Sequence, residues 1–424
     1  MDALLCRYRN ERRKFYARHG ARWPGTLADE FDILAPCPLS RAEADEILNA
    51  TASLARIYDR AAQLLRRVSD QALLEMGVPR YLLPAVRCAI PGMTDCVVGR
   101  FDLARTEHGY KLLEFNADVA GLLVEAFSIN REVCRDAGNE DPNESGERDL
   151  VYALTKAVQA GLKYVGKKET DQANVVVTSC GRCIRDVALA QYLCRLLEAF
   201  PARYSPIESL SIDAEGLYDP RGNRIDVLYR AFPLRFIRNE IFHPRETPMD
   251  PQMGGLVLRF VERQQLAIIN PPFSFLLENK ALQAVIWNLF ESGQYFAEDE
   301  SQLISRFMLP TYLDPPSDNT AYVVKPAYGA EGDTVKVMSH GGRVLYQSSC
   351  ATHDDGFMVY QKHVDLMPSE MMTEYGPRTL HVVTSAFVLA GKPSGICMRA
   401  GSAITDDSAW VLPVCISKED GTSE

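Results

Sequence analysis

The segment from Arg100 to Asp118 constrains the fold most, because its residues alternate between polar and apolar around one turn. This alternation is typical of two β-strands that flank Glu107-His108-Gly109. A three-residue hairpin loop places glycine at its last, left-handed position, and Gly109 fits that position. The loop fixes the register, which pairs Ala104 with Leu112, Asp102 with Glu114 and Arg100 with Asn116.

The predicted hairpin has one polar and one apolar face. The polar face carries Arg100, Asp102, Glu114 and Asn116, and the apolar face, which we expect in the core, carries Phe101, Leu103, Leu113 and Phe115. Two facing carboxylates repel each other unless a cation lies between them. Such oxygen ligands suit Mg²⁺, which commonly binds together with substrate phosphates. A solvent-exposed face with ordinary ion pairs explains the spacing equally well.

Composition narrows the class of protein. The chain has 424 residues, with 46% hydrophobic and 24% charged residues, enough for two or three globular domains. A net charge of −10 disfavours non-specific binding to nucleic acid or to an anionic membrane. The start of the chain is charged too early for a secretory signal, and no apolar run approaches a membrane span. Eleven scattered cysteines indicate reduced thiols, so we predict a cytoplasmic protein.

The rest of the chain divides into helical and strand-rich parts. An amphipathic pattern predicts a helix over 40–75 with Ser40 as its N-cap, a second helix over 122–129 and an exposed loop over 136–148. The alternation of a strand at 174–179, a helix at 182–200 and a strand at 225–230 indicates a small parallel α/β layer. A helix at 278–292 precedes a region that is mostly strand, with strands at 322–325, 335–338, 357–361, 381–389 and 395–399.

Three motifs in the strand-rich part suit a nucleotide. Lys325 ends a strand before a loop that contains Gly329 and Gly332, and such lysines and glycine loops bind phosphates, although an ordinary hairpin explains them about as well. The strand over 357–361 ends in polar residues up to His363 and suits an adenine edge, although a plain strand end is the favoured interpretation. Arg399 precedes a small-residue loop and suits a phosphoryl group, the alternative being a surface arginine.

The order and spacing of these motifs resemble the C-terminal synthetase domain of the glutathionylspermidine synthase family, which are ATP-grasp carbon–nitrogen ligases. The matching residues run from about 40 to 416 and comprise Arg100-Phe-Asp102, Glu114-Phe-Asn116-Ala-Asp118, Asn279-Lys280, Lys325-Pro326 with Gly329-Ala-Glu331-Gly332, Tyr360-Gln361, and Met398-Arg399 with Thr405-Asp406. The resemblance implies an ATP-grasp fold of mixed α/β (α+β) class. It also implies three regions: an N-terminal helical region with the metal-binding hairpin (1–165), a small parallel pre-ATP-grasp-like domain (166–265) and an ATP-grasp region with a lid (266–424).

The resemblance further implies a role for each matching residue. Asp102, Glu114 and Asn116 would bind Mg²⁺, with two ions expected; Lys280 and Lys325 would bind ATP phosphates; Gln361 and His363 would lie around adenine; Arg100 and Arg399 would stabilise the transferring phosphoryl group; Glu331 and Gly332 would belong to the lid. The implied reaction joins a small-molecule or peptide carboxylate to an amine through an acyl phosphate.

One departure from the family pattern concerns the second substrate. The family's Tyr-Pro-Trp-Glu-Trp segment corresponds to Phe232-Pro-Leu-Arg235-Phe, so an acidic side chain is replaced by a basic one. Arg235 favours an anionic or zwitterionic partner, so glutathione and spermidine are not assumed. We also expect the N–H groups at the start of a predicted helix, together with Arg182 or Arg185, to bind a substrate carboxylate.

Two other classes of protein stay open. Cys180 and Cys183 form a Cys-x-x-Cys pair at a helix start, where thiol pKa values fall, so a thiol oxidoreductase is one alternative. The other alternative is a protein that retains the fold and binds ATP without catalysis.

Overall fold

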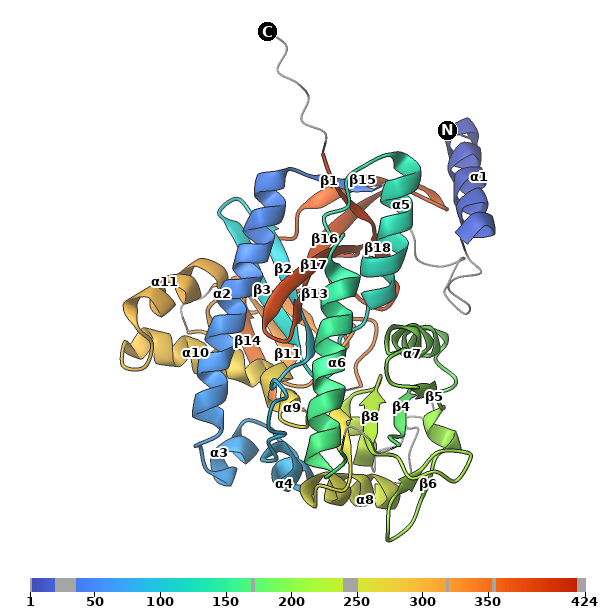
Figure 1. The fold of residues 1–424 in the computed structure, drawn as a ribbon. Coiled ribbons are helices and arrows are strands. Elements are labelled where there is room, and N and C mark those ends of the chain that lie inside the picture. Colours follow the sequence, from blue (N-terminus) through green and yellow to red (C-terminus); the bar gives the residue numbers. More distant parts are fainter. Residues whose placement is uncertain are drawn as a thin grey trace.

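The computed structural model describes residues 2–19, 36–168, 172–238, 251–317, 320–352 and 356–417. Helices surround three main sheets, which confirms the predicted mixed α/β class (Figure 1). No helix in these ranges is both long and apolar enough to cross a bilayer. The helices are α1 (Asp2–His19), α2 (Arg41–Leu65), α3 (Asp70–Glu75), α4 (Leu83–Val86), α5 (Asn130–Ala137), α6 (Gly146–Tyr164), α7 (Ile184–Leu196), α8 (Pro251–Glu262), α9 (Ser274–Glu278), α10 (Lys280–Ser292) and α11 (Glu298–Phe307), with the shorter turns η2 (Arg80–Leu82), η3 (Glu125–Ile129), η4 (Ile207–Ser209) and η5 (Leu234–Arg238).

The six-stranded sheet combines the hairpin with strands from the end of the chain. Its order is β18-β17-β16-β2-β3, and β15 also pairs with β16. The hairpin strand β2 pairs antiparallel with β16, so residues from the first and the last predicted regions share one sheet. The division at residues 165 and 265 stays a prediction. The strands are β2 (Val98–Thr106), β3 (Gly109–Asn116), β15 (Pro368–Thr373), β16 (Gly376–Leu389), β17 (Lys392–Gly401) and β18 (Trp410–Leu412).

The hairpin differs from the prediction near its turn. Thr106 pairs with Gly109, so the loop has two residues instead of three, and Ala104 faces Lys111 rather than Leu112. A β-bulge beyond Asp102 inserts Leu113 and restores the predicted pairs of Asp102 with Glu114 and Arg100 with Asn116.

The bulge also exchanges the faces of two leucines. Leu112 is buried in the core, and Leu113, which was expected there, turns its side chain toward a pocket. Phe101 and Phe115 lie in the core as predicted and stack with their ring centroids 4.0 Å apart. The bulge therefore changes the surroundings of the polar face without moving the carboxylates.

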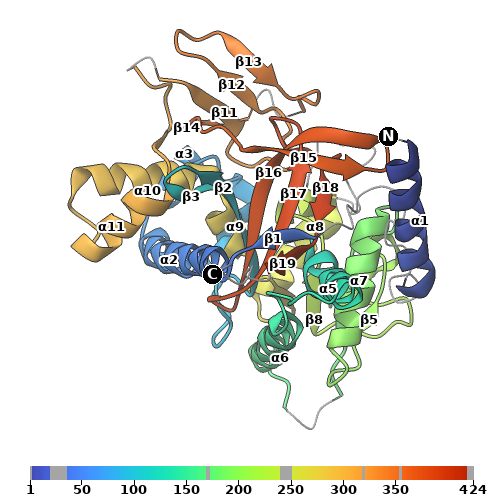
Figure 2. The same cartoon turned by 90° about the horizontal axis from the view of Figure 1, so that it is seen from above.

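A five-stranded antiparallel sheet lies above the six-stranded one in the view of Figure 2. Its order is β10-β14-β11-β12-β13, and α10 packs against β10 and β14. The predicted strands at 322–325, 335–338 and 357–361 correspond to three of its members. The strands are β10 (Thr311–Tyr312), β11 (Tyr322–Pro326), β12 (Lys336–Met338), β13 (Val344–Gln347) and β14 (Met358–Lys362).

The predicted parallel α/β layer is a four-stranded parallel sheet with the order β5-β4-β8-β9. Helix α6 contacts strands of this sheet and also β16 and β17, so it lies between the two layers. The four strands are β4 (Val175–Thr178), β5 (Arg203–Tyr204), β8 (Val227–Arg230) and β9 (Ala267–Ile269), and two small ribbons pair β1 (Cys37–Leu39) with β19 (Val414–Ile416) and β6 (Ser211–Ile212) with β7 (Leu217–Tyr218).

The helix predicted over 40–75 is two helices, of which the first, α2, packs across β16 and β17. The Ser40 hydroxyl caps α2 as expected, by accepting a hydrogen bond from the amide of Glu43. The Ser69 hydroxyl caps α3 in the same way, so a second N-cap begins a new helix. The Arg87 guanidinium donates to the carbonyls of Leu65 and Val68 and so satisfies the chain between the two helices.

The chain near residue 130 is more helical than predicted. The helix expected over 122–129 contains the π-helical turn η3 and continues as α5, which ends before Gly138, a residue with a φ of 64°. Helix α6 begins at Gly146, so the loop expected over 136–148 is shortened at both ends.

Asn270 links the parallel sheet to the hairpin. Its side-chain oxygen accepts from the amides of Val97 and Val98, and its side-chain nitrogen donates to the carbonyls of Val98 and Ala117. Only 2% of Asn270 is exposed, so water cannot replace these partners if the side chain is removed.

We therefore expect Asn270→Ala to lower the free energy of unfolding by about 3 kcal/mol, because several buried backbone groups lose their partners. Denaturant titration followed by circular dichroism measures this change. The control is Asn49→Ala on the exposed face of α2, which should stay within about 0.5 kcal/mol of wild type. Equal effects of the two substitutions would contradict the linking role.

Candidate active site

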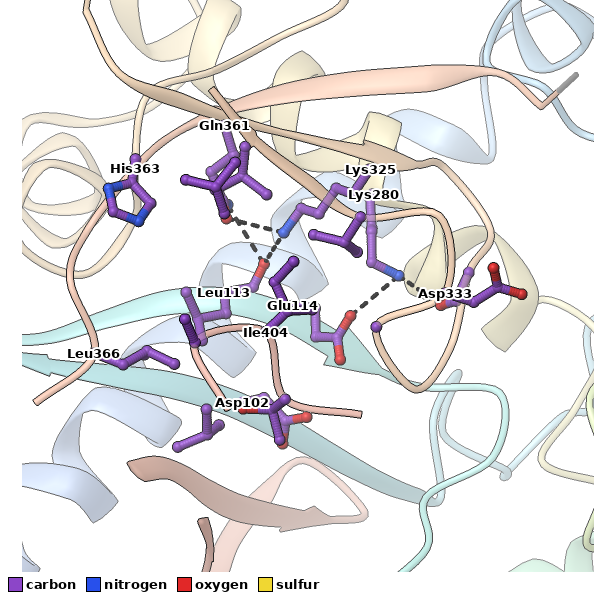
Figure 3. Close-up of a pocket in the computed structure, with 18 of the residues that line it drawn as sticks. Asp102, Leu113, Glu114, Lys280, Lys325, Asp333, Gln361, His363, Leu366 and Ile404 are labelled. Carbon is purple, nitrogen blue, oxygen red and sulfur yellow. Dashed lines mark hydrogen bonds and ion pairs between the residues drawn. The ribbon is translucent and has the colours of Figure 1, made fainter. Parts of the chain in front are cut away.

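A pocket lies between the six-stranded and five-stranded sheets (Figure 3). It holds about 820 Å³ of space, counting the part that is open to solvent. The six-stranded sheet contributes Asp102, Leu113, Glu114, Val383 and Arg399, the five-stranded sheet contributes Val323, Lys325, Val337 and Gln361, and Lys280 enters from the start of α10.

Asp102 is the centre of a hydrogen-bond network beneath the pocket. Its Oδ1 accepts from Arg100 Nε at 2.8 Å and from Ser385 Oγ at 2.7 Å. Its Oδ2 accepts from Arg100 Nη2 at 2.9 Å, from Arg399 Nη2 at 2.8 Å and from Asn116 Nδ2 at 3.2 Å. Four side chains from different strand positions therefore converge on one carboxylate.

The network keeps Asp102 ionised. Burial opposes the charged form, but the adjacent charges of Arg100 and Arg399 outweigh burial and lower the pKa of Asp102 below its ordinary value. Burial likewise opposes the charge of Arg100, and Asp102 raises the pKa of that guanidinium. Asp102 and Arg399 line the pocket, whereas Arg100 and Asn116 do not appear among its described lining residues.

Lys280 connects the two sheets. Its Nζ lies 3.1 Å from Glu114 Oε2 and donates to the Gly329 carbonyl at 2.8 Å. The position of Lys280 is fixed by Asn279, whose Oδ1 caps α10 through the amide of Ala281. The side chain of Lys280 is 6% exposed, so its charge is balanced mainly by Glu114 rather than by water.

Lys325 enters the same pocket from β11. Its Nζ donates to the Leu113 carbonyl at 2.7 Å and to Gln361 Oε1 at 2.9 Å (Figure 3). The β-bulge supplies this carbonyl, because Leu113 is the residue that it inserts. Gln361 is in turn fixed by Gln283 of α10, whose Oε1 accepts from Gln361 Nε2 at 2.8 Å.

The pKa of Lys325 is lowered to about 7. Burial is the largest cause, Lys280 acts in the same direction, and the charge of Glu114 opposes both. Lys325 and Glu114 thus interact across the pocket, so the hairpin and the downstream lysine share one electrostatic site. An anion bound beside Lys325 would favour its charged form.

The glycine loop after β11 closes one side of the pocket. Gly332 has a φ of 70°, and a Cβ at this position would lie 2.8 Å from the Thr405 carbonyl oxygen. Only glycine therefore allows this close approach. The lid role that the resemblance implies for Glu331 and Gly332 stays a prediction; in the structure Gly332 lines the pocket and Glu331 has a φ of 54°.

Apolar side chains line much of the rest of the pocket. Leu113, Val323, Val337, Leu366 and Ile404 line it, and His363 lies among its lining residues. Burial lowers the pKa of His363, so its neutral form is favoured. The end of β14 is predicted to lie near adenine, but these apolar residues are not predicted, because single leucines, valines and isoleucines in a mostly β region carry no separate signal.

The donor set limits how a metal ion could bind. Within the described ranges, no three His, Cys, Asp or Glu side chains form a ready-made metal cage. Asp102 and Glu114 face each other in register and both line the pocket. Mg²⁺ needs only one or two carboxylates when phosphates and water supply its other ligands, so Glu114 fits Mg²⁺ in that form, and Asp102 fits it once one of its five hydrogen-bond donors gives way to the ion. Asn116 contacts Asp102 through its amide nitrogen instead.

The two arginines expected at a substrate lie away from this pocket. Arg182 is exposed before α7, and Arg235 lies in η5, where its guanidinium contacts the Phe236 ring at 4.6 Å. Neither belongs to the described pocket lining. The Gly181 amide, at the helix start where a substrate carboxylate was expected, donates to Glu208 within the chain, at 3.1 Å to its nearer oxygen.

The second cysteine of the Cys-x-x-Cys pair, Cys183, does not have the expected electrostatics. All eleven cysteines are free thiols. Burial is the largest cause that raises the pKa of Cys183 to about 11, and the nearby Asp186 carboxylate acts in the same direction. The expected lowering by the helix start is therefore outweighed for Cys183, and the arrangement gives a redox pair no support.

A buried polar cluster beside Lys280 was missed by sequence reasoning. Asp118 forms a buried ion pair with Arg230 and accepts from the Leu234 amide at 2.6 Å. Glu278, two residues before Lys280, accepts from the Asp118 amide at 2.8 Å. Burial, with Asp118 adding to it, raises the pKa of Glu278 to about 7. Two features of the sequence could have indicated this cluster. Asp118 directly follows the hairpin motif, and Arg230 lies at the end of a buried strand.

Comparison with known proteins identifies the fold and the family of this chain. A solved structure of a glutathione synthetase-like effector from Globodera pallida aligns with a TM-score of 0.54 at 16% identity, covering 90% of this chain and 89% of that one. The fold is therefore of the glutathione synthetase-like ATP-grasp type. The sequence profile of the glutathionylspermidine synthase preATP-grasp family matches residues 6–417. The chain belongs to this family, as the motif order predicts.

Curated relatives are ligases at low identity. The bifunctional glutathionylspermidine synthetase/amidase of Escherichia coli K12 is 21% identical over 395 residues, which are 90% of this chain. The chain spans 59% of the length of that relative. A putative acid–amine ligase of Haemophilus influenzae is 22% identical over 330 residues, covering 74% of this chain and 73% of that protein.

The Asp102 network predicts a strong effect on stability. Asp102→Asn leaves Arg100 and Arg399 close together without the charge that balances them, so we expect a loss of about 3–5 kcal/mol in the free energy of unfolding at pH 7. Thermal and denaturant unfolding measure it, with the exposed Asp45→Asn as control. A loss below about 1 kcal/mol would show that solvent, rather than Asp102, balances the two arginines.

Proposed function

We propose that this protein is an ATP-dependent ligase that joins a carboxylate to an amine and forms an amide. The single observation that carries the proposal is the meeting of Lys280, Lys325 and the facing Asp102 and Glu114 in one pocket between two sheets. Family membership and the ligase relatives support it. The carboxylate is a small molecule or peptide, and ATP is the second substrate.

Each wall of the pocket suits one part of the nucleotide. The apolar side chains Leu113, Val337 and Leu366 suit the faces of adenine, and the end of β14 near His363 suits its polar edge. Lys280 and Lys325 suit the phosphates, because a lysine ammonium binds a phosphate as a compact charge. Asp102 and Glu114 would hold Mg²⁺, of which we propose two ions; bound Mg²⁺ would neutralise charge on the phosphates.

The proposed reaction has two steps. In the first, a carboxylate oxygen of the acyl substrate attacks the γ-phosphorus of ATP, so that ADP leaves and an acyl phosphate forms. In the second, the amine nitrogen attacks the acyl carbon, phosphate leaves with the bonding pair, and the nitrogen loses a proton to form the amide. Lys280, Lys325 and Arg399 supply positive charge where the transferring group becomes negative. The glycine loop at Gly332 would exclude water.

We propose the two substrates only by chemical class, as a carboxylate and an amine. Arg235 stands where the family pattern has an acidic residue, but its charge acts on Glu278, whose pKa it lowers against the effect of burial. Arg182 and Arg235 as substrate groups stay predictions, and a polyamine is not assumed as the amine.

Trapping of the acyl phosphate tests the proposal without knowledge of the amine. Hydroxylamine with ATP, Mg²⁺ and a panel of carboxylic acids should give a hydroxamate and ADP with wild type. We expect Lys325→Ala and Glu114→Ala each to lower the rate about 100-fold or more. The first removes a positive charge beside the phosphates, and the second removes a carboxylate that would hold Mg²⁺ there. Lys392→Ala, which is exposed at the start of β17, is the control and should keep the wild-type rate.

Measurements of ATP binding separate the remaining alternatives. ATP binding without hydroxamate or phosphate release across the panel would replace the ligase with a non-catalytic ATP-binding protein. Loss of activity in Cys180→Ser but not in Lys325→Ala would instead favour thiol chemistry.

The lowered pKa of Lys325 predicts a pH dependence of ATP binding. With a pKa of about 7, Lys325 is mostly neutral at pH 8 in the free protein, and bound phosphate restores its proton. The ATP affinity should therefore fall as pH rises above 7, approaching tenfold per pH unit, and binding at pH 8 should take up nearly one proton. Calorimetry in buffers of different ionisation enthalpy measures this uptake, which Lys325→Ala should abolish. Proton release, or no exchange in wild type, would contradict it.

A further inference from the structure

A second cavity lies between α1 and the turn that joins β15 to β16. Figure 2 shows α1 beside the end of this strand pair. The cavity holds about 1050 Å³ of space, counting the part that is open to solvent, and is thus larger than the nucleotide pocket on the same measure. Its lining consists of Arg9, Arg12, Arg13, Tyr16 and Ala17 from α1 and Glu374 and Tyr375 from the turn.

The spacing on α1 shows that one helix face lines the cavity. Residues 9, 12, 13, 16 and 17 are separated by the three- and four-residue steps that bring helix side chains onto one face. A helix that packs on a protein normally turns apolar residues inward. Here three arginines face the cavity instead, in a chain whose net charge is −10. Attachment of a helix alone does not require this arrangement.

Other residues attach α1 to the protein. Phe15 is 5% exposed and packs in the core, with its ring 4.8 Å from the His19 ring. His19 lies 3.4 Å from Glu132 and 3.2 Å from Asp136, both of which belong to α5. Arg9 and Arg12 add contacts with the turn, whereas Arg13 takes no part in these attachments among the described residues.

The charge of the cavity is unbalanced. Among the described residues of its lining, Glu374 is the only acidic one, and it lies 3.3 Å from Arg12 Nη1. The Arg9 guanidinium donates two hydrogen bonds to the Glu374 backbone carbonyl, from Nε at 2.8 Å and from Nη2 at 2.6 Å. Among the described residues, Arg13 has no hydrogen-bond or ion-pair partner. The lining thus holds three positive charges and one negative charge.

Glu374 adds a second requirement on a ligand. Its Oε2 faces Arg12, but its Oε1 is buried and has no hydrogen-bond partner within the described part of the chain. A buried carboxylate oxygen needs a donor. The best complement of the cavity therefore carries negative groups for the arginines and a hydroxyl group for Glu374.

We propose that this cavity binds a small hydroxylated polyanion. Guanidinium groups pair with carboxylate and phosphate oxygens through parallel hydrogen bonds, so both kinds of anion match Arg13 and its neighbours. A ligand of several hydrogen-bonding groups, rather than a single ion, matches the volume. The site is separate from the nucleotide pocket, because the two linings share no residue among those described.

Calorimetry on the full chain tests the site with two probes: citrate, a hydroxylated tricarboxylate, and ribose 5-phosphate. Lys325→Ala serves as the background protein, so that binding of either anion in the nucleotide pocket is suppressed. We expect at least one probe to bind with a dissociation constant below 1 mM, on the order of specific small-ligand affinities. The probe that binds more tightly identifies the anion as carboxylate or phosphate.

Adding Arg13→Ala should weaken binding about tenfold or more, because a charged hydrogen-bond partner is lost. Arg148→Ala on the exposed side of α6 is the matched control and should bind as the background does. As a second measurement, the bound probe should protect Arg13 of wild type from phenylglyoxal, read by mass spectrometry. Failure of both probes to bind, or equal affinity with and without Arg13 and no protection, would overturn the proposal.

Discussion

The ionised carboxylate of Asp102 is the interaction on which the rest of the site depends. It lies between Arg100 and Arg399 and also accepts from Ser385, so it joins β2, β16 and β17 at one point of the six-stranded sheet. A charge at this depth is stable only because two guanidiniums offset the loss of water. The same arrangement keeps Asp102 ionised where it lines the pocket.

Opposite charges then hold the second sheet against the first. Lys280 reaches Glu114 and the glycine loop at once, and Lys325 reaches the hairpin through the Leu113 carbonyl. These contacts within the protein thus hold the two walls of the pocket together without help from a ligand. A bound polyphosphate would compete with Glu114 and Leu113 for the lysines, so an exchange of partners would accompany its entry.

The sequence predicted those parts of the site that depend on local alternation and motif order. The pairs of Asp102 with Glu114 and Arg100 with Asn116 were predicted correctly, although the assumed loop length was wrong, because the bulge at Leu113 compensates for the shorter loop. The parallel layer was also predicted, since continuous apolar strands alternate with a helix there.

The missed features depend on contacts between distant segments. Nothing near Ser385 or Gln283 in the sequence indicates that one would donate to Asp102 and the other would accept from Gln361. The helix over 40–75 was expected to be continuous because a second serine cap looks like an ordinary polar helix residue until Arg87 is placed beside it. Cys183 was misjudged because burial, which a sequence does not display, outweighs the effect of the helix start.

The pairing of β2 with β16 also has a consequence for biosynthesis. The hairpin is made well before β16, the strand that covers the free edge of β2. Until then β2 exposes unpaired backbone groups, which are a template for wrong association between nascent chains. The architecture that assembles the pocket from segments far apart in the sequence therefore delays its completion, and the protection of this edge, until β16 has been translated.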